Sequence, residues 1–300
     1  YDIHNLYDTH DSYDPYNILF DPLYDLNSPL INGLLLNAKW GDVDPDDYLG
    51  QNGFEPTKIT YYIGQTGDSI SAAGDTFNAV TPKPGEQEAI EASMKAFSDV
   101  AQLSFEASSS LSGNTTIAWG VSADESIYHG VADFPGDSEA TAASGVIIFN
   151  EDYDADGEEV NPGSYFYLTY IHELGHALGL AHPHNGGEYG GNFYESALFP
   201  GVSEGAESSA GEFENNSTPW TVMTYNDFAS YLMVNDASGQ IDYVSPGDES
   251  FDGYLENLGP LDIAAVQYLY GPNHQNNAGN TVYALNEYEL DGYRSIWDAS

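Results

Sequence analysis

The spacing of hydrophobic and polar residues predicts three helices among short strands. Apolar residues recur at helical spacing over 86–103, and acidic residues in the first turn suit the positive end of the helix dipole. The same spacing predicts helices over 164–178 and 261–270, the latter bracketed by Gly-Pro pairs. Apolar runs rich in β-branched and aromatic residues predict strands over 58–63, 115–119 and 146–149. This order of elements is typical of an α/β fold with a mixed, twisted sheet flanked by helices.

Two long stretches lack such a pattern. Residues 1–30 are rich in tyrosine and aspartate, and we expect them to wrap over the surface. The stretch 185–219 is rich in glycine, serine and glutamate, which predicts a long, flexible loop. No apolar run reaches the roughly 18 residues of a membrane span, so we expect no membrane segment. The first residues do not form a signal peptide, so we expect one to have been removed or export to use another route.

Composition narrows the classes of partner and of metal site. Hydrophobic residues make up 41% of the 300, enough for a sizeable core. The absence of cysteine excludes disulfides and thiolate ligands, which leaves histidine and carboxylate groups to bind a transition metal. Acidic residues number 48 against 5 basic ones, so we exclude nucleic acid and anionic membranes as partners of a basic patch. The net charge of −43 favours adaptation to salty or marine water, and calcium sites built from carboxylates are the alternative interpretation.

A short segment at the end of the second predicted helix has the pattern of a metal site. Residues 172–182 read H-E-x-x-H-x-x-G-x-x-H. His172 and His176 are four residues apart, so they share a helix face and can bind one ion. Gly179 marks the helix end because glycine adopts left-handed backbone angles, and the chain then turns to bring back His182 as third ligand. Three protein nitrogens and one exchangeable water describe a catalytic zinc site.

Glu173 follows the first ligand and is placed to hold the water at the open metal position. A zinc ion there activates the water and polarises a carbonyl, while Glu173 accepts the proton of the water and passes it to a leaving amine. The alternative is an amphipathic core helix whose histidines are merely hydrogen-bonded. The extended motif arises by chance in about one in tens of thousands of chains of this length, which favours zinc.

A second segment adds a resemblance to a known family. Met223-Thr224-Tyr225 follows the long loop, and here the sequence resembles the metzincin metalloproteases, in which a methionine-containing turn lies beneath the metal. More closely it is similar to the serralysins, secreted bacterial proteases whose turn reads Met-Ser-Tyr. The segments 261–271, 281–283 and 296–299 also resemble that family, so the resemblance covers residues 31–300.

This resemblance implies a secreted, extracellular zinc endopeptidase with a metzincin-type fold and an active-site cleft over the zinc helix. It implies Tyr225 as a further zinc ligand that swings away to stabilise the oxyanion, and Met223 as the structural residue of the turn. Protein or peptide substrates are the implied partners, with a monomeric enzyme and a proteinaceous inhibitor. The strand that precedes the zinc helix is then the edge on which substrate lies, at Val146, Ile147 and Ile148. Its uniformly apolar pattern also fits a buried central strand.

The resemblance further implies three regions: an N-terminal segment over 1–30, a metzincin-like catalytic domain over 31–271, and a region over 272–300 that leads toward a calcium-binding β-roll. The glycine- and aspartate-rich nonapeptide repeats of that roll do not occur in these residues, which leaves calcium dependence open. Asp152–Gly157 matches the first half of an EF-hand loop, but Gly163 stands where a bidentate glutamate is needed. An ordinary acidic turn is therefore favoured there over a looser calcium site.

We therefore predict a zinc endopeptidase with His172, His176 and His182 as ligands. One alternative is a zinc amidase of narrow specificity, whose cleft the stretch 185–219 would narrow. Another is a non-catalytic, calcium-dependent adhesion or matrix protein that keeps the zinc-protease fold. His184 lies two residues past a ligand, and we expect it at the surface rather than in the cleft.

Overall fold

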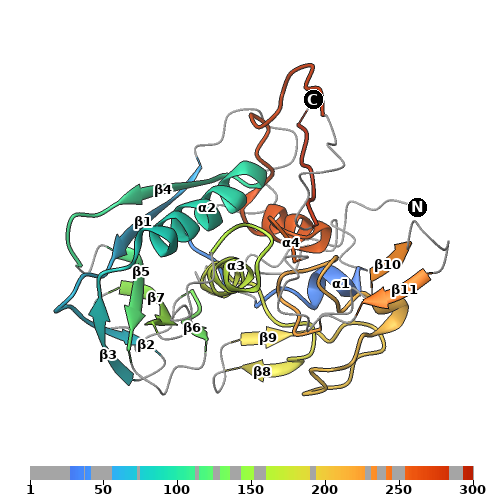
Figure 1. The fold of residues 1–300 in the computed structure, drawn as a ribbon, viewed down its shortest axis with the longest axis horizontal. Coiled ribbons are helices and arrows are strands. Elements are labelled where there is room, and N and C mark those ends of the chain that lie inside the picture. The colour runs from blue at the N-terminus through green and yellow to red at the C-terminus, as the bar shows by residue number, and fades with distance from the viewer. Residues whose placement is uncertain are drawn as a thin grey trace, which may run out of the picture.

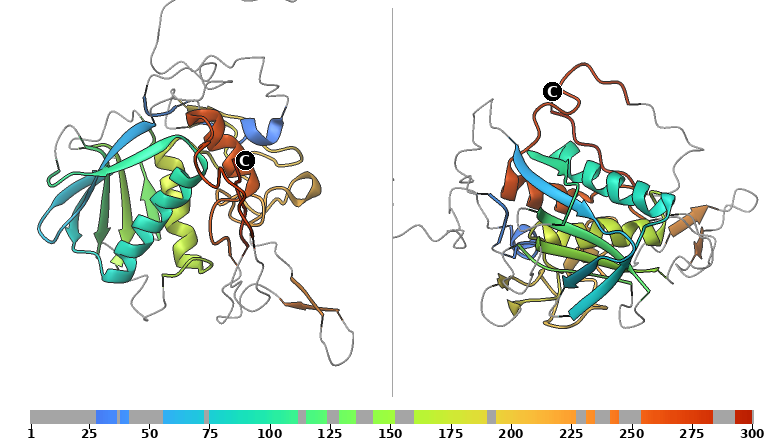
Figure 2. Two further views of the ribbon diagram at one scale, coloured as in Figure 1. Left: turned by 90° about the horizontal axis from the view of Figure 1, so that it is seen from above. Right: turned by 90° about the vertical axis from the view of Figure 1, so that its left-hand side faces the viewer.

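The computed structural model describes residues 28–36, 38–41, 56–72, 75–111, 115–123, 129–135, 143–151, 160–189, 194–226, 231–234, 241–244, 254–283 and 293–299. In this part of the chain a twisted sheet has two helices, α2 (Pro84–Val100) and α3 (Tyr165–Ala177), packed against one of its faces. A further helix, α4 (Pro260–Tyr270), packs against α2 on the side away from the sheet (Figures 1 and 2). The mixed α/β fold expected from the sequence is confirmed.

The sheet has seven strands and is mixed. Its main order is β4 (Leu103–Ala107), β1 (Thr57–Ile63), β5 (Thr115–Ser122), β7 (Ala143–Asn150) and β6 (Gly130–Ala132). The first four of these run parallel and β6 runs antiparallel. A hairpin of β2 (Ser69–Ala72) and β3 (Asp75–Val80) joins the end of β5 in antiparallel register. The predicted strands correspond to β1, β5 and β7.

Each long helix begins at a residue that satisfies its free backbone donors. In α2, Pro84 fits the first turn and the Glu86 carboxylate accepts the Lys83 N–H at 2.6 Å. In α3, the Ser164 hydroxyl accepts the Tyr167 N–H at 3.1 Å. These boundaries agree with the predicted helices to within a few residues.

Glycine ends α3 as the sequence predicts. Gly179 has a φ of +103°, and a Cβ at this position would lie 2.1 Å from the Ala38 carbonyl oxygen. The Gly179 and Leu180 amides still donate to the carbonyls of His176 and Gly175. The close approach of residue 38 and the left-handed angle both require glycine here.

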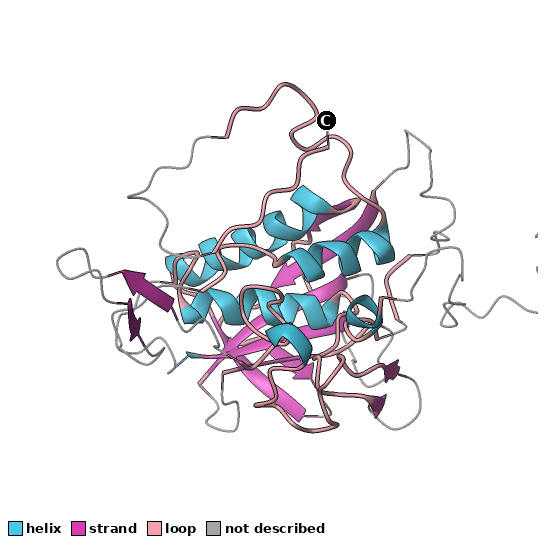
Figure 3. Ribbon diagram, turned by 90° about the vertical axis from the view of Figure 1, so that its right-hand side faces the viewer, coloured by secondary structure: helices cyan, strands magenta, loops and turns pink. Residues whose placement is uncertain are grey.

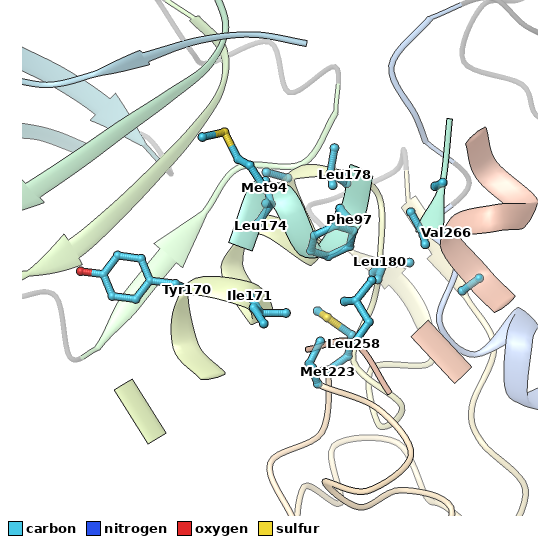
Figure 4. Close-up of a cluster of buried hydrophobic side chains, with 14 of the residues drawn as sticks. Met94, Phe97, Tyr170, Ile171, Leu174, Leu178, Leu180, Met223, Leu258 and Val266 are labelled. Atoms are coloured by element: carbon cyan, nitrogen blue, oxygen red, sulfur yellow. The ribbon is translucent and has the colours of Figure 1, made fainter. Parts of the chain in front are cut away.

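The main core lies where α2, α3 and α4 meet. Figure 4 shows Phe97 of α2, Leu174 of α3 and Val266 of α4 in one buried cluster with Met223. Toward the sheet, the Phe149 ring of β7 stacks on Tyr170 of α3 with centroids 4.0 Å apart. Because α3 is enclosed by the sheet, α2 and the Met223 region, it is buried almost all round from Tyr167 onward. Side chains on this helix therefore occupy fixed positions.

Smaller elements lie outside this core. A short helix, α1 (Pro29–Asn32), packs against α4, and two hairpins consist of β8 (Gly187–Tyr189) with β9 (Tyr194–Ser196) and β10 (Tyr231–Val234) with β11 (Ile241–Val244), as Figure 3 shows. The stretch 185–219, expected as a flexible loop, holds β8, β9 and the 3-10 turn η3 (Glu212–Glu214). Its other described residues form turns and coil, as expected of a loop, and backbone hydrogen bonds link them to one another and to Pro183 and His184. The flexibility of this loop stays a prediction. No helix among the described residues has both the length and the hydropathy to span a membrane.

Candidate metal centre

The structure brings His172, His176 and His182 together at one point. The Nε2 atom of His172 lies 3.1 Å from that of His176 and 3.0 Å from that of His182. The third pair, His176 and His182, is 2.9 Å apart. All three side chains are buried, and they form the one histidine and carboxylate group with metal-ligand spacing among the described residues.

The ring nitrogens that face away from this point show which tautomer is present. Nδ1–H of His172 donates to the Val222 carbonyl at 2.7 Å, and Nδ1–H of His176 donates to the Leu180 carbonyl at 2.8 Å. A carbonyl oxygen only accepts, so the proton lies on Nδ1 and the Nε2 lone pair points inward. Lone pairs that face each other at this distance repel unless a cation lies between them. Ligands of a tetrahedral zinc at ~2.0–2.1 Å are about 3.3 Å apart, so the three nitrogens fit such an ion after a small outward adjustment.

Burial keeps these imidazoles neutral, as metal ligands must be. Removal from water lowers the pKa of His172 to about 4, while the hydrogen bond to Val222 opposes the shift in part. Burial also lowers the pKa of His176 and of His182 well below the usual value, and the neighbouring histidines add to this shift. The site therefore presents three neutral nitrogen donors at neutral pH.

Glu173 follows the first candidate ligand on α3, with 8% of its surface exposed. Burial raises its pKa to about 8. Its neighbour is the edge strand β6, where a Cβ on Gly130 would lie 2.9 Å from the Glu173 Cγ. The carboxyl group is thus held between α3 and β6. The sequence pattern identified Glu173 but gave no signal for Gly130.

The two turn residues occupy different environments. Met223 is fully buried, and a Cβ on Gly175 would lie 2.6 Å from its sulfur, so the turn packs directly against α3. Tyr225 is 52% exposed, and its ring lies over the cluster at 4.5 Å from the His182 ring and 5.6 Å from the His172 ring. The structure therefore brings the Tyr225 ring to the histidine rings and places Met223 against the helix that carries two of the three histidines.

A buried carboxylate joins this turn to α4. Asp262 accepts hydrogen bonds from the Thr221 hydroxyl at 2.5 Å, the Val222 N–H at 2.7 Å and the Gly259 N–H at 2.9 Å. Burial raises the pKa of Asp262 to about 7, although the three donors lower it in part. Because the Val222 carbonyl holds His172, Asp262 fixes the backbone that orients a candidate ligand. The sequence analysis did not single out Asp262, which stands within the predicted helix over 261–270.

Two expectations about the surroundings were wrong. Val146, Ile147 and Ile148 do not form a sheet edge, because β7 pairs with β5 on one side while β6 and the Asp133 N–H pair on the other. Their uniformly apolar pattern reflects burial on both faces. His184 is not at the surface: it is 2% exposed and stacks on the His182 ring at 5.0 Å. The candidate calcium stretch, Asp152–Gly157, lies outside the described residues, as does nearly all of the N-terminal segment.

Comparison with known proteins gives consistent results. Residues 55–197 match the matrixin family. Serralysin B of Dickeya chrysanthemi is 29% identical over 236 residues, which cover 72% of this chain and 42% of that protein. Metalloprotease AprA of Pseudomonas entomophila is 27% identical over 282 residues, or 90% of this chain and 49% of that protein. The chain thus spans half the length or less of these relatives. With the zinc-binding motif, the converging histidines and the methionine turn, these matches identify the chain as serralysin-like, a resemblance to the metzincin metalloproteases.

Proposed function

We propose that the chain is a zinc-dependent endopeptidase that hydrolyses peptide bonds in proteins. The observation that carries the proposal is the convergence of three Nε2 atoms within 3.1 Å of one another, two of them with Nδ1 hydrogen-bonded to a backbone carbonyl. This donor set suits zinc, and three protein ligands leave the fourth position for water or substrate. When bound there, zinc supplies Lewis acidity toward the water and the scissile carbonyl.

Glu173 then acts as the general base. A zinc ion at the three nitrogens would lower the pKa that burial raises, so that the group is ionised. The carboxylate takes a proton from the water as the water oxygen bonds to the carbonyl carbon. The same group delivers that proton to the amine nitrogen as the C–N bond breaks. Its packing against Gly130 supports this role, because the contact restrains the Glu173 side chain directly after the first candidate ligand.

In this proposal the substrate contacts the exposed Tyr225 ring and the edge strand β6. The Tyr225 hydroxyl donates a hydrogen bond to the oxyanion that develops on the substrate carbonyl. Substrate lies extended along β6 (Gly130–Ala132) rather than along β7, since β6 is the outer strand and is adjacent to Glu173. Met223 supports the floor of the site without touching substrate.

The remaining expectations complete the proposal. Export to the cell exterior, a monomeric state and a proteinaceous inhibitor are supported by the serralysin likeness. In this proposal residues 1–30 form an N-terminal segment, residues 31–271 form the catalytic domain, and residues 272–300 belong to a separate C-terminal region. Calcium binding is a second, separate expectation that rests on acidic composition.

The test combines elemental analysis with cleavage of casein by the wild type and by Glu173→Gln. We expect one zinc per chain in both proteins, because Glu173 is not a ligand, and a loss of cleavage of about 10²- to 10⁴-fold in the variant. Glu86→Gln is the matched control, since Glu86 is also a buried carboxylate and it caps α2, a helix that does not carry the candidate ligands. This control should keep both zinc and activity.

The other outcomes discriminate between functions. Zinc in the wild type without cleavage of casein would contradict a broad endopeptidase and direct attention to a narrow amidase or a non-catalytic role. Absence of zinc from the wild type would contradict the proposal altogether.

A further inference from the structure

The third candidate ligand stands at the start of a tight, well-anchored turn. The His182 carbonyl accepts the Asn185 N–H at 3.2 Å, which closes a four-residue turn with Pro183 in its second position, where proline is favoured. The Pro183 carbonyl accepts the Phe199 N–H at 3.1 Å, and the His184 carbonyl accepts the Gly205 N–H at 2.9 Å. The turn is therefore tied at three backbone positions, and its side chains have defined places.

This turn brings the Asn185 side chain back to the His182 ring. The nitrogen Nδ2 of the Asn185 side-chain amide lies 2.6 Å from Nδ1 of His182. The other two candidate ligands meet backbone carbonyls at the same ring position. Among the three ring partners, Asn185 is thus the one that belongs to a side chain and that a substitution can remove.

The three-nitrogen geometry decides which atom of the amide must face the ring. With Nε2 of His182 directed at the other two ligands, the ring proton lies on Nδ1 and needs an acceptor. The amide nitrogen is only a donor, so the amide oxygen has to occupy this contact, which a half-turn of the terminal amide achieves. His184 stacks on a face of the His182 ring, with the two ring centroids 5.0 Å apart and the two planes 9° from parallel.

We propose that Asn185 is a positioning residue for the metal centre, whose amide oxygen accepts the Nδ1–H of His182 and sets both the tautomer and the tilt of the third ligand. The proposal rests on metal binding by the three histidines, as in the proposed function. It adds a residue outside the zinc-binding motif on which the affinity for metal depends. Partners of this kind change metal affinity by about 10- to 100-fold when they are removed.

The test is zinc affinity, measured by competition with a chromophoric chelator, in the wild type, Asn185→Leu and Asn185→Asp. Leucine has a similar volume but no acceptor, so we expect zinc to dissociate about 10- to 100-fold more readily. Aspartate restores an acceptor at the same place, so Asn185→Asp should bind zinc at least as tightly as the wild type. The visible spectrum of the cobalt-substituted protein should change in the leucine variant alone, because the third ligand tilts.

Asn257→Leu is the matched control. Asn257 is also a half-buried asparagine whose amide holds a loop, through the Ser295 backbone at 2.7 Å and 2.9 Å, but it touches no candidate ligand. We expect it to lower stability without changing zinc affinity or the cobalt spectrum. If it weakens zinc as much as Asn185→Leu does, the effect is general loosening and the proposal is overturned.

Other results would distinguish failure of the Asn185 proposal from failure of the proposed function. Wild-type zinc affinity in Asn185→Leu would overturn the role of Asn185 and leave the metal centre intact. Equal losses in the leucine and aspartate variants would also overturn it, because an acceptor would then make no difference. A wild type that binds no zinc would overturn the inference and the proposed function together.

Discussion

Gly130 lies on β6 opposite Glu173, and its lack of a side chain is what lets the two come together. A Cβ at this position would lie 2.9 Å from the Glu173 Cγ and 3.1 Å from the Phe149 ring. The ring cannot yield easily, because it stacks on Tyr170 in the core. An added methyl group must therefore displace the Glu173 side chain, which is the group proposed to move the proton.

We therefore predict that Gly130→Ala lowers kcat of casein hydrolysis by about 10- to 100-fold, since small misplacements of a catalytic group have effects of this size. Zinc content should remain at the wild-type level, because the three histidines are untouched. Gly85→Ala is the control, since a Cβ at Gly85 meets nothing within 4 Å. Loss of zinc from Gly130→Ala, or unchanged kcat, would contradict the argument.

For single residues, the sequence predicts the site residues that belong to one short motif. It misses those that reach the site from other parts of the chain. His172, His176 and His182 stand at spacings that a helix and its glycine stop convert directly into a cluster. Asn185 and Gly130 have no such spacing. Their contacts depend on how a turn folds back and on which strand pairs with β7, and neither is encoded in local periodicity.

At the scale of elements, α4 supports the metal centre through its first turn. Asp262 caps α4 at Gly259 and also receives donors from residues 221 and 222 of the methionine turn. The Val222 carbonyl in turn holds His172. One buried carboxyl group thus links the start of a helix to the orientation of a candidate ligand on another helix.

This link predicts how stability depends on pH. The pKa of Asp262 is raised from 3.8 to about 7 in the folded protein, so folding favours its protonated form. The resulting stabilisation is fully present below the unfolded pKa and is lost as the pH rises through the folded value. Relative to Asp262→Asn, which does not titrate, the wild type should lose about 2–3 kcal/mol of unfolding free energy between pH 5 and pH 7, and little more above pH 7.

The measurement is urea unfolding of both proteins at saturating zinc from pH 5 to pH 8, in which the zinc dependence common to both cancels. A constant difference between the wild type and Asp262→Asn over this range would show that the carboxyl group stays charged in the folded state, contrary to the prediction.

The helices and strands that the sequence predicts correctly are those with a clear apolar pattern or a high content of β-branched residues. Helices α2, α3 and α4 carry long apolar patterns and clear end signals, and β1, β5 and β7 are rich in buried or β-branched residues. The missed strands are mostly short, and β6 has only three residues, all half-buried. Such segments become strands because a neighbour offers free backbone groups, so their own residues give little indication.

For the whole molecule, charge is the dominant property. A net charge of −43 over 300 residues means that most acidic groups have no basic partner. Ion pairs join Lys58 to Glu106, Lys95 to Asp99 and Arg294 to Glu256. The first two lie at the surface, where such pairs contribute little. The remaining acidic groups repel one another, and compact folding brings them closer together than they are in the unfolded chain.

Dissolved salt should therefore stabilise the fold at neutral pH. The Debye length falls from about 10 Å at 0.1 M to about 3 Å at 1 M salt, so repulsion between surface carboxylates is screened over this range. We predict that 1 M NaCl raises the midpoint of thermal unfolding at pH 7 by roughly 5 °C or more, equivalent to about 3 kcal/mol for a chain of this size. Scanning calorimetry at saturating zinc measures it. Near the sequence pI of 4.1 the net charge vanishes, and the gain from salt should shrink with it. An equal gain at both pH values would mean that salt acts on apolar burial rather than on charge.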